Sequence, residues 1–135
     1  MVIRVFPLVI LFFCIGTVSI FGQEADLEES MLRGEMVYMD FCVTCHLEDG
    51  KGVANTFPPL AQSDYLKNNR EASIRGIKYG QQGEMVVNGV TYNNVMAPMG
   101  LDDSEIADVM NYILNSWGNW SDHFVTTDEV ARVEK

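Results

Sequence analysis

The chain has 135 residues, enough for a leader and one small domain, and 9 lysines and arginines against 19 acids give it a formal net charge of −10. This balance excludes nucleic acid as a partner, because binding to phosphates needs clustered basic residues. An acidic surface can instead steer association with a basic protein, and such steering weakens as salt is added. An ordinary acidic soluble protein has the same charge, so charge alone does not select a docking surface.

Residues 1–22 have the pattern of a secretory signal peptide. A single arginine precedes an apolar run over residues 5–21, which contains no acid. Small residues allow cleavage at two places, so we expect the mature chain to begin near residue 20 or residue 23. Cys14 follows two phenylalanines where a lipid-attachment signal needs small residues, and we interpret it as part of the discarded leader. A leader retained as a membrane anchor is the alternative, because the apolar run is close to the length that spans a bilayer.

Cys42, Cys45 and His46 form the pattern C-x-x-C-H. Cysteines three positions apart lie on the same side of a helical turn, so both thiols can reach the two vinyl groups along one edge of a haem. His46 follows directly and can bind the iron from the same face. The pattern therefore favours covalent haem attachment.

Two other kinds of site also begin with C-x-x-C. A zinc site needs four ligands, and beyond the motif the chain offers only His123 near its end and Cys14 in the leader. A thiol oxidoreductase needs a βαβ context, which the sequence does not show, and has no use for the histidine. His123 is an available ligand for an alternative site, but a lone histidine in a polar segment is more often a solvated surface residue.

An acidic lead-in over residues 23–30 comes before the first predicted helix, for which Ser30 is a suitable N-cap. Apolar residues recur at helical spacing from there to Phe41, just before the haem motif. Gly34 interrupts this helix at a propensity cost of ~1 kcal/mol. That cost suggests that another backbone approaches closely, and an indifferent surface glycine is the alternative.

A polar loop follows the motif and leads to the segment 57–60, Phe-Pro-Pro-Leu. Pro58 and Pro59 cannot donate backbone hydrogen bonds but keep their carbonyls, which suits a rigid segment against a flat apolar cofactor. A metal-bound histidine also needs its second ring nitrogen hydrogen-bonded, so the Pro58 carbonyl is a candidate acceptor for His46. A loop that two prolines merely stiffen is the alternative.

Short helical stretches are predicted from Ser63 to Gly80, where the glycine is a suitable stop. A hairpin is then predicted over residues 85–92, because Asn88 and Gly89 stand between β-forming residues. The hairpin is too short to make this a β protein.

Asp102, with Glu105 three positions later, predicts the capped start of a final helix. Its apolar face is expected to include Trp117, and Gly118 is expected to end it. Residues 120–135 are predicted to be a polar C-terminal tail without a domain of its own.

The second axial ligand of a six-coordinate iron must come from this downstream half. Met96 and Met99 both lie in a proline-stiffened loop, away from the regular helices. A thioether ligand raises the reduction potential, because soft sulfur favours ferrous iron. Most of the 8 methionines are interpreted as core residues, whereas the loop context favours ligation by one of this pair.

The motif at residues 42–46, the segment 57–60, Met96 before a capped helix and the run 112–119 together resemble class I c-type cytochromes. The likeness spans residues 31–119. It implies an all-α fold of three to five short helices around one covalently attached haem c, with the N- and C-terminal helices crossing. It also implies that Met96 is the distal ligand, although Ala97 stands where the family has the proline directly. This departure leaves Met99 as the alternative ligand.

The resemblance also implies roles for residues that are weakly informative alone. Gly34 matches the glycine where the first and last helices cross, with Tyr38 and Tyr112 beside it. Pro58 matches the proline whose carbonyl accepts the proximal histidine's hydrogen bond. Leu60 matches an aliphatic wall of the haem pocket.

The expected function is periplasmic one-electron transfer by a haem with His/Met axial ligation, and not catalysis. With both axial positions filled, chemistry is limited to outer-sphere exchange at a haem edge, which Val43 and Thr44 should flank. The resemblance implies redox partners, namely a dehydrogenase, reductase or oxidase, and the charge implies a basic docking face on that partner. Membrane contact is expected only if the leader is retained. The alternative is an open-site haem protein, peroxidase-like or gas-binding.

Overall fold

The computed structural model describes residues 19–135. Most of the expected leader, residues 1–22, and Cys14 therefore lie outside the described residues. No helix within residues 19–135 combines the length and the apolar character needed to cross a membrane. The described chain is mostly helical with one small hairpin, so the all-α prediction is confirmed, with six helices in place of three to five.

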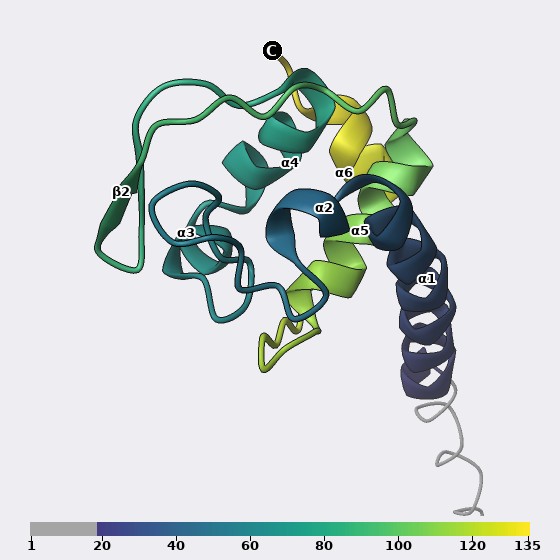
Figure 1. Ribbon diagram of the computed structural model, residues 1–135. Helices are drawn as coiled ribbons and strands as arrows, with labels where there is room; N and C mark the ends of the chain where they lie inside the picture. The colour runs from purple at the N-terminus through teal and green to yellow at the C-terminus, as the bar shows by residue number, and fades with distance from the viewer. Residues whose placement is uncertain (1–18) are drawn as a thin grey trace, which may run out of the picture.

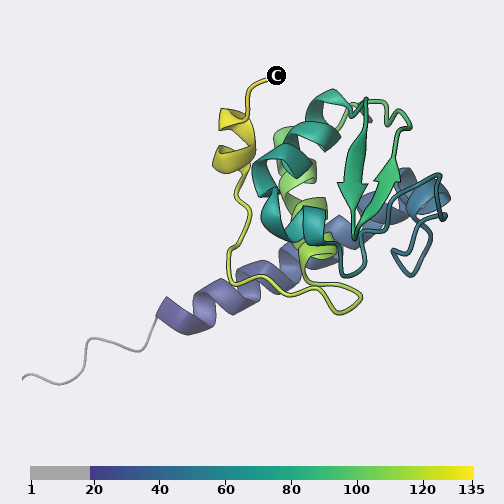
Figure 2. The same cartoon turned by 90° about the vertical axis from the view of Figure 1, so that its left-hand side faces the viewer.

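The helices and strands surround a central single turn, α2 (Figure 1). The two short helices that follow α2 and the two-stranded hairpin lie on one side of it in Figure 1, and the first and fifth helices lie on the other side. Figure 2 shows the first and fifth helices crossing each other. The elements are α1 (Ser19–Phe41), α2 (Val43–His46), α3 (Asp64–Asn68), α4 (Arg70–Tyr79), β1 (Met85–Val87), β2 (Val90–Tyr92), α5 (Asp103–Leu114) and α6 (Thr127–Arg132).

The local signals read from the sequence are present at the ends of these elements. Ser63 caps α3 by accepting a hydrogen bond from the Leu66 amide, and Gly80 ends α4 with φ of 88°. Asn88 and Gly89 both have positive φ, as a two-residue turn of the I′ type requires, and they join strands paired Val87 to Val90. Asp102 forms a complete capping box at the start of α5.

The crossing of α1 and α5 holds the two ends of the domain together. A Cβ atom added at Gly34 would lie 2.0 Å from the Asp108 carbonyl oxygen, so the two backbones meet where the sequence has no side chain. Tyr38 and Tyr112 pack beside the crossing with ring centroids 5.5 Å apart. The close approach that the helix-breaking glycine suggested is confirmed.

Ser30 does not cap α1, and that prediction is wrong. Helix α1 begins at Ser19, so residues 23–30 belong to it and do not form a separate lead-in. Ser30 is fully buried, and its hydroxyl donates to Asp108 on α5 at 2.6 Å. The same hydroxyl accepts from the buried Asn111 side chain at 2.9 Å. A serine that resembled a cap is therefore a buried link between two helices.

The prediction of a plain polar tail over residues 120–135 is also wrong. Val125, Val130 and Val133 from this segment are buried in the core, and α6 packs against α5. Asn111 forms two hydrogen bonds with the Val125 backbone, donating to its carbonyl and accepting from its amide. Three valines among many polar residues make too weak a pattern to predict this packing.

Long polar side chains of α4 form hydrogen bonds with the C-terminal segment, residues 120–135. Arg70 donates to both carboxylate oxygens of Glu129, at 2.6 and 2.8 Å, and to the carbonyls of His123 and Phe124. Lys78 donates to the Val130 carbonyl. The C-terminal segment thereby joins α4 to α5.

We expect Glu129→Gln to destabilise the protein more at pH 7 than at pH 3. Arg70 lowers the pKa of the Glu129 carboxyl, so this contribution is complete above the ordinary pKa, about 4.3, and is lost as pH falls through the lower folded-state value. Urea unfolding of both proteins at the two pH values measures the difference. Glu84→Gln, at an exposed residue without an ion pair among the described residues, is the control. An equal Glu129→Gln effect at both pH values would contradict this account.

Candidate haem site

The C-x-x-C-H motif folds as a single turn directly after α1. The Cys42 amide donates to the Tyr38 carbonyl at 2.9 Å, and the His46 amide donates to the Cys42 carbonyl at 2.9 Å. This turn places Cys42, Cys45 and His46 on the wall of one cavity, as their spacing predicts. The two cysteines are half-buried and form no disulfide.

The cavity encloses about 230 Å³ and is lined mainly by apolar side chains. Pro58 and Leu60 line it from the loop after the motif, and Val87 and Tyr92 from the hairpin. Among its other apolar lining residues are Phe41, Phe57, Pro59, Leu66, Ile77, Met85, Val95, Leu101, Val109 and Ile113.

His46 is 9% exposed, and its Nδ1 lies 3.0 Å from the Pro58 carbonyl oxygen. Burial lowers the pKa of this imidazole, and the Pro58 carbonyl opposes the shift in part. The carbonyl can only accept, so the neutral ring carries its proton on Nδ1 and donates it. The lone pair on Nε2 is then available to a metal, which is the arrangement of a fixed histidine ligand.

The Cys42 thiol has a pKa raised to about 11, first by burial and then by the neighbouring Cys45. This thiol is neutral at pH 7. Redox-active thiols and zinc ligands need the thiolate, which low-pKa surroundings favour. The high pKa of Cys42 therefore disfavours the two alternatives for the C-x-x-C pattern, a thiol oxidoreductase and a zinc site.

Met96 is anchored in the cavity by its backbone. Its amide and carbonyl pair with the carbonyl and amide of Gln81, both at 2.8 Å. Its Cε lies 3.8 Å from the position that a Cβ at Gly76 would take, so the thioether reaches the face of α4 that lines the cavity. Met99 lines the same cavity but has no such backbone pair among the described residues. His123 lies elsewhere, with a side chain that is 80% exposed.

The prediction that Trp117 lies on the apolar face of the final helix is wrong. Helix α5 ends at Leu114, and Trp117 lies beyond it with φ of 52°. Its Nε1 donates to the Glu48 carbonyl at 2.9 Å, and its ring packs over Gly50 in the loop after the motif. The ring centroid of Trp117 lies 5.0 Å from that of Tyr38. Trp117 therefore fixes the loop that leads from His46 to Pro58, a role that no local sequence signal predicts.

These residues fit a haem. An apolar cavity suits a flat macrocycle, two cysteines on one wall suit thioether links, and a neutral imidazole and thioethers are ligands that haem iron accepts.

Comparison with known proteins supports the same assignment. The family model for cytochrome c matches residues 31–117. Cytochrome c-552 of Thermus thermophilus is 40% identical over 91 residues, which cover 64% of this chain and 69% of that protein. The cytochrome c subunit of the quinone alcohol dehydrogenase of Gluconacetobacter polyoxogenes is 30% identical over 114 residues, 74% of this chain but 22% of that subunit. The gluconate 2-dehydrogenase cytochrome c subunit of Pantoea cypripedii is 29% identical over 126 residues, 87% of this chain and 29% of the subunit. The chain therefore belongs to the cytochrome c family, and its cofactor is a covalently bound haem c.

Proposed function

We propose that the protein carries single electrons between redox proteins of the periplasm, with His46 and Met96 as the axial ligands of its haem iron. The observation that supports this most directly is one apolar cavity that both residues line, with Cys42 and Cys45 on its wall. The haem supplies one-electron exchange between ferric and ferrous iron.

Each residue of the site has a separate task in this proposal. Cys42 and Cys45 form the thioether links, and Pro58 keeps the His46 ring in the tautomer that presents Nε2. Met96 favours the ferrous state and raises the reduction potential. Leu60 belongs to the apolar wall that keeps water from the site. With both axial positions filled by protein, no substrate reaches the iron, so the protein transfers electrons and is not itself a catalyst.

The partner proposed here is a redox enzyme, of which a dehydrogenase is the best supported. Two of the relatives are named as cytochrome subunits of an alcohol dehydrogenase and of a gluconate dehydrogenase. The net charge of −10 predicts a basic docking face on the partner. Export through residues 1–22 places the protein in the periplasm, and a retained leader would tether it to the membrane.

The test is the absorption spectrum of the haem-loaded protein with and without carbon monoxide. We expect low-spin iron with methionine ligation that does not bind carbon monoxide in the ferrous state. Met96→Ala should open the iron to carbon monoxide, whereas Met99→Ala, the matched control from the same loop, should leave the spectrum unchanged.

If Met99→Ala opened the iron to carbon monoxide and Met96→Ala did not, the distal ligand would be Met99. A native ferrous protein that binds carbon monoxide readily would contradict axial closure and favour an open-site haem protein.

A further inference from the structure

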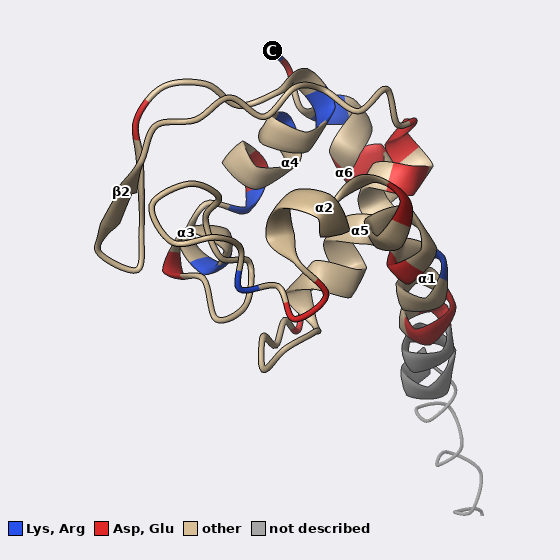
Figure 3. Cartoon of the chain, viewed as in Figure 1, with Lys and Arg blue, Asp and Glu red and all other residues tan. Residues whose placement is uncertain are grey.

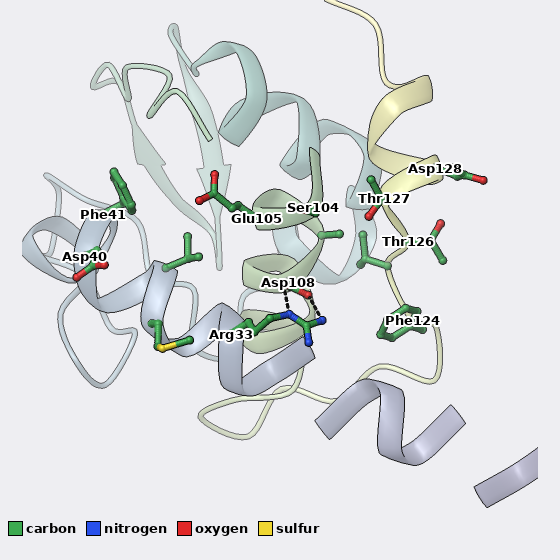
Figure 4. A pocket seen from close by; sticks show the side chains of 14 residues that line it. Arg33, Asp40, Phe41, Ser104, Glu105, Asp108, Phe124, Thr126, Thr127 and Asp128 are labelled. Atoms are coloured by element: carbon green, nitrogen blue, oxygen red, sulfur yellow. Dashed lines mark hydrogen bonds and ion pairs between the residues drawn. The ribbon is translucent and has the colours of Figure 1, made fainter. Parts of the chain in front are cut away.

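A groove of about 780 Å³ lies on the face of the molecule formed by α1, the start of α5 and the segment before α6. Figure 4 shows Asp40 and Phe41 at one end, Glu105 and Asp108 in the middle, and Phe124 toward the other end. The groove is separate from the cavity described above, except that Phe41 lines both.

Exposed apolar side chains form the α1 wall of the groove. Met36 is 62% exposed and Phe41 is 45% exposed. Leu32 and Met39 do not line the groove, but both are exposed beside it, four positions before and three positions after Met36 on the same helix. This spacing forms a ridge of the kind that packs against a second helix.

The charges around the groove are mostly negative. Among the residues that the structure describes, Arg33 is the one basic residue that lines the groove. Its guanidinium is already paired with Asp108 at 2.7 and 3.0 Å. Asp40 forms no ion pair within residues 19–135. Figure 3 marks several acidic residues along α1 and at the start of α5. A ligand of this groove must therefore combine an apolar ridge with positive charge.

We propose that the groove receives a basic amphipathic helix of the redox partner. Such a helix would place apolar side chains against Met36 and Phe41 and basic side chains beside Asp40. A second copy of this chain would bring the same acidic residues to the interface, and an anionic membrane would repel them. Charge therefore selects a basic protein segment over both.

The position of Phe41 links this docking surface to electron transfer, and in this respect the inference rests on the proposed function. A helix seated in the groove contacts Phe41, whose ring also lines the cavity that holds the haem. The partner would then be held one side chain from the cofactor. Val43 and Thr44, which the sequence predicts beside the haem edge, do not line the groove.

The probe is a synthetic helical peptide of about 18 residues, five turns, with leucine on one face and lysine on the other. Its binding to the haem-loaded full chain is measured by calorimetry. We expect saturable binding at one site, and no binding of a peptide with glutamate in place of lysine. The absorption spectrum, recorded in parallel, reports the axial ligation of the haem iron. A failure of the proposed function would therefore appear in the spectrum, whereas a failure of the docking proposal would appear in the calorimetry.

Matched variants test the location. Asp40→Lys and Met36→Gln should each weaken binding about fivefold to tenfold. Glu84→Lys makes the same charge change at an exposed residue outside both cavities, and Val86→Gln makes a similar polar change at a side chain that is 52% exposed. Both controls should bind the peptide as the parent protein does.

Four results would overturn the proposal. Equal weakening by Asp40→Lys and Glu84→Lys would mean general charge attraction without a site. No saturable binding, or binding that survives Asp40→Lys combined with Met36→Gln, would place the contact elsewhere or remove it. Self-association that Met36→Gln abolishes would show that a second copy covers the groove.

Discussion

Replacing Gly34 with alanine should lower the free energy of unfolding of the haem-loaded protein by ~3 kcal/mol or more. The new methyl group would lie 2.0 Å from the Asp108 carbonyl oxygen and 2.9 Å from the Tyr112 Cβ. The first of these atoms is backbone, so no rotamer change relieves the clash. Helices α1 and α5 must separate, and the packing of Tyr38 against Tyr112 is lost with them. Urea unfolding followed by far-UV circular dichroism measures the change.

Leu32→Ala is the control for this substitution, because it places alanine on the same helix at a side chain that is 59% exposed. We expect it to change the unfolding free energy by no more than about 0.5 kcal/mol. Similar midpoints for the two variants would show that the helix crossing tolerates a side chain and that our account of Gly34 is wrong.

Asn111→Leu should destabilise the protein by ~3 kcal/mol, although leucine has a similar size and is apolar. Asn111 is fully buried and has 0% exposure. Its side chain donates to the Val125 carbonyl and to the Ser30 hydroxyl, and it accepts from the Val125 amide. Leucine would leave the amide and the carbonyl of Val125 buried without partners. Urea unfolding again measures the effect.

The control for Asn111→Leu is Asn68→Leu, at an exposed residue of α3 whose side chain has no hydrogen bond among the described residues. It should be nearly neutral. Adding Ser30→Ala to Asn111→Leu should cost less than Ser30→Ala costs alone, because the two side chains share one network. Additive effects would mean that Ser30 and Asn111 act independently.

Features encoded by neighbouring residues could be predicted from the sequence. The turn at Asn88 and Gly89 needs only two residues with positive φ, and the capping box at Asp102 needs only Glu105 three positions later. The spacing of Cys42, Cys45 and His46 likewise fixes their common side of one turn. Each signal acts over a few residues, so the folded structure adds little to it.

Features that depend on distant partners could not be predicted in this way. Ser30 has the residue type of a cap, but its partners Asp108 and Asn111 follow it by 78 and 81 positions. Trp117 packs over Gly50, and Arg70 reaches Glu129 across 59 positions. The contact between Arg70 and Glu129 explains why the sequence of residues 120–135 predicted a polar tail, because a partner of this segment lies on α4.

The crossing of α1 and α5 also bears on the order in which the molecule is made. Helix α1 ends at Phe41, but the residues that cover it belong to α5, which begins at Asp103. Contacts between distant parts of a chain form only after the intervening segment has been brought together. Because the chain is synthesised from its N-terminus, Cys42 and Cys45 are accessible long before α5 is available to pack against α1. Maturation has a window for modifying these thiols, and that window ends when about the last quarter of the chain arrives.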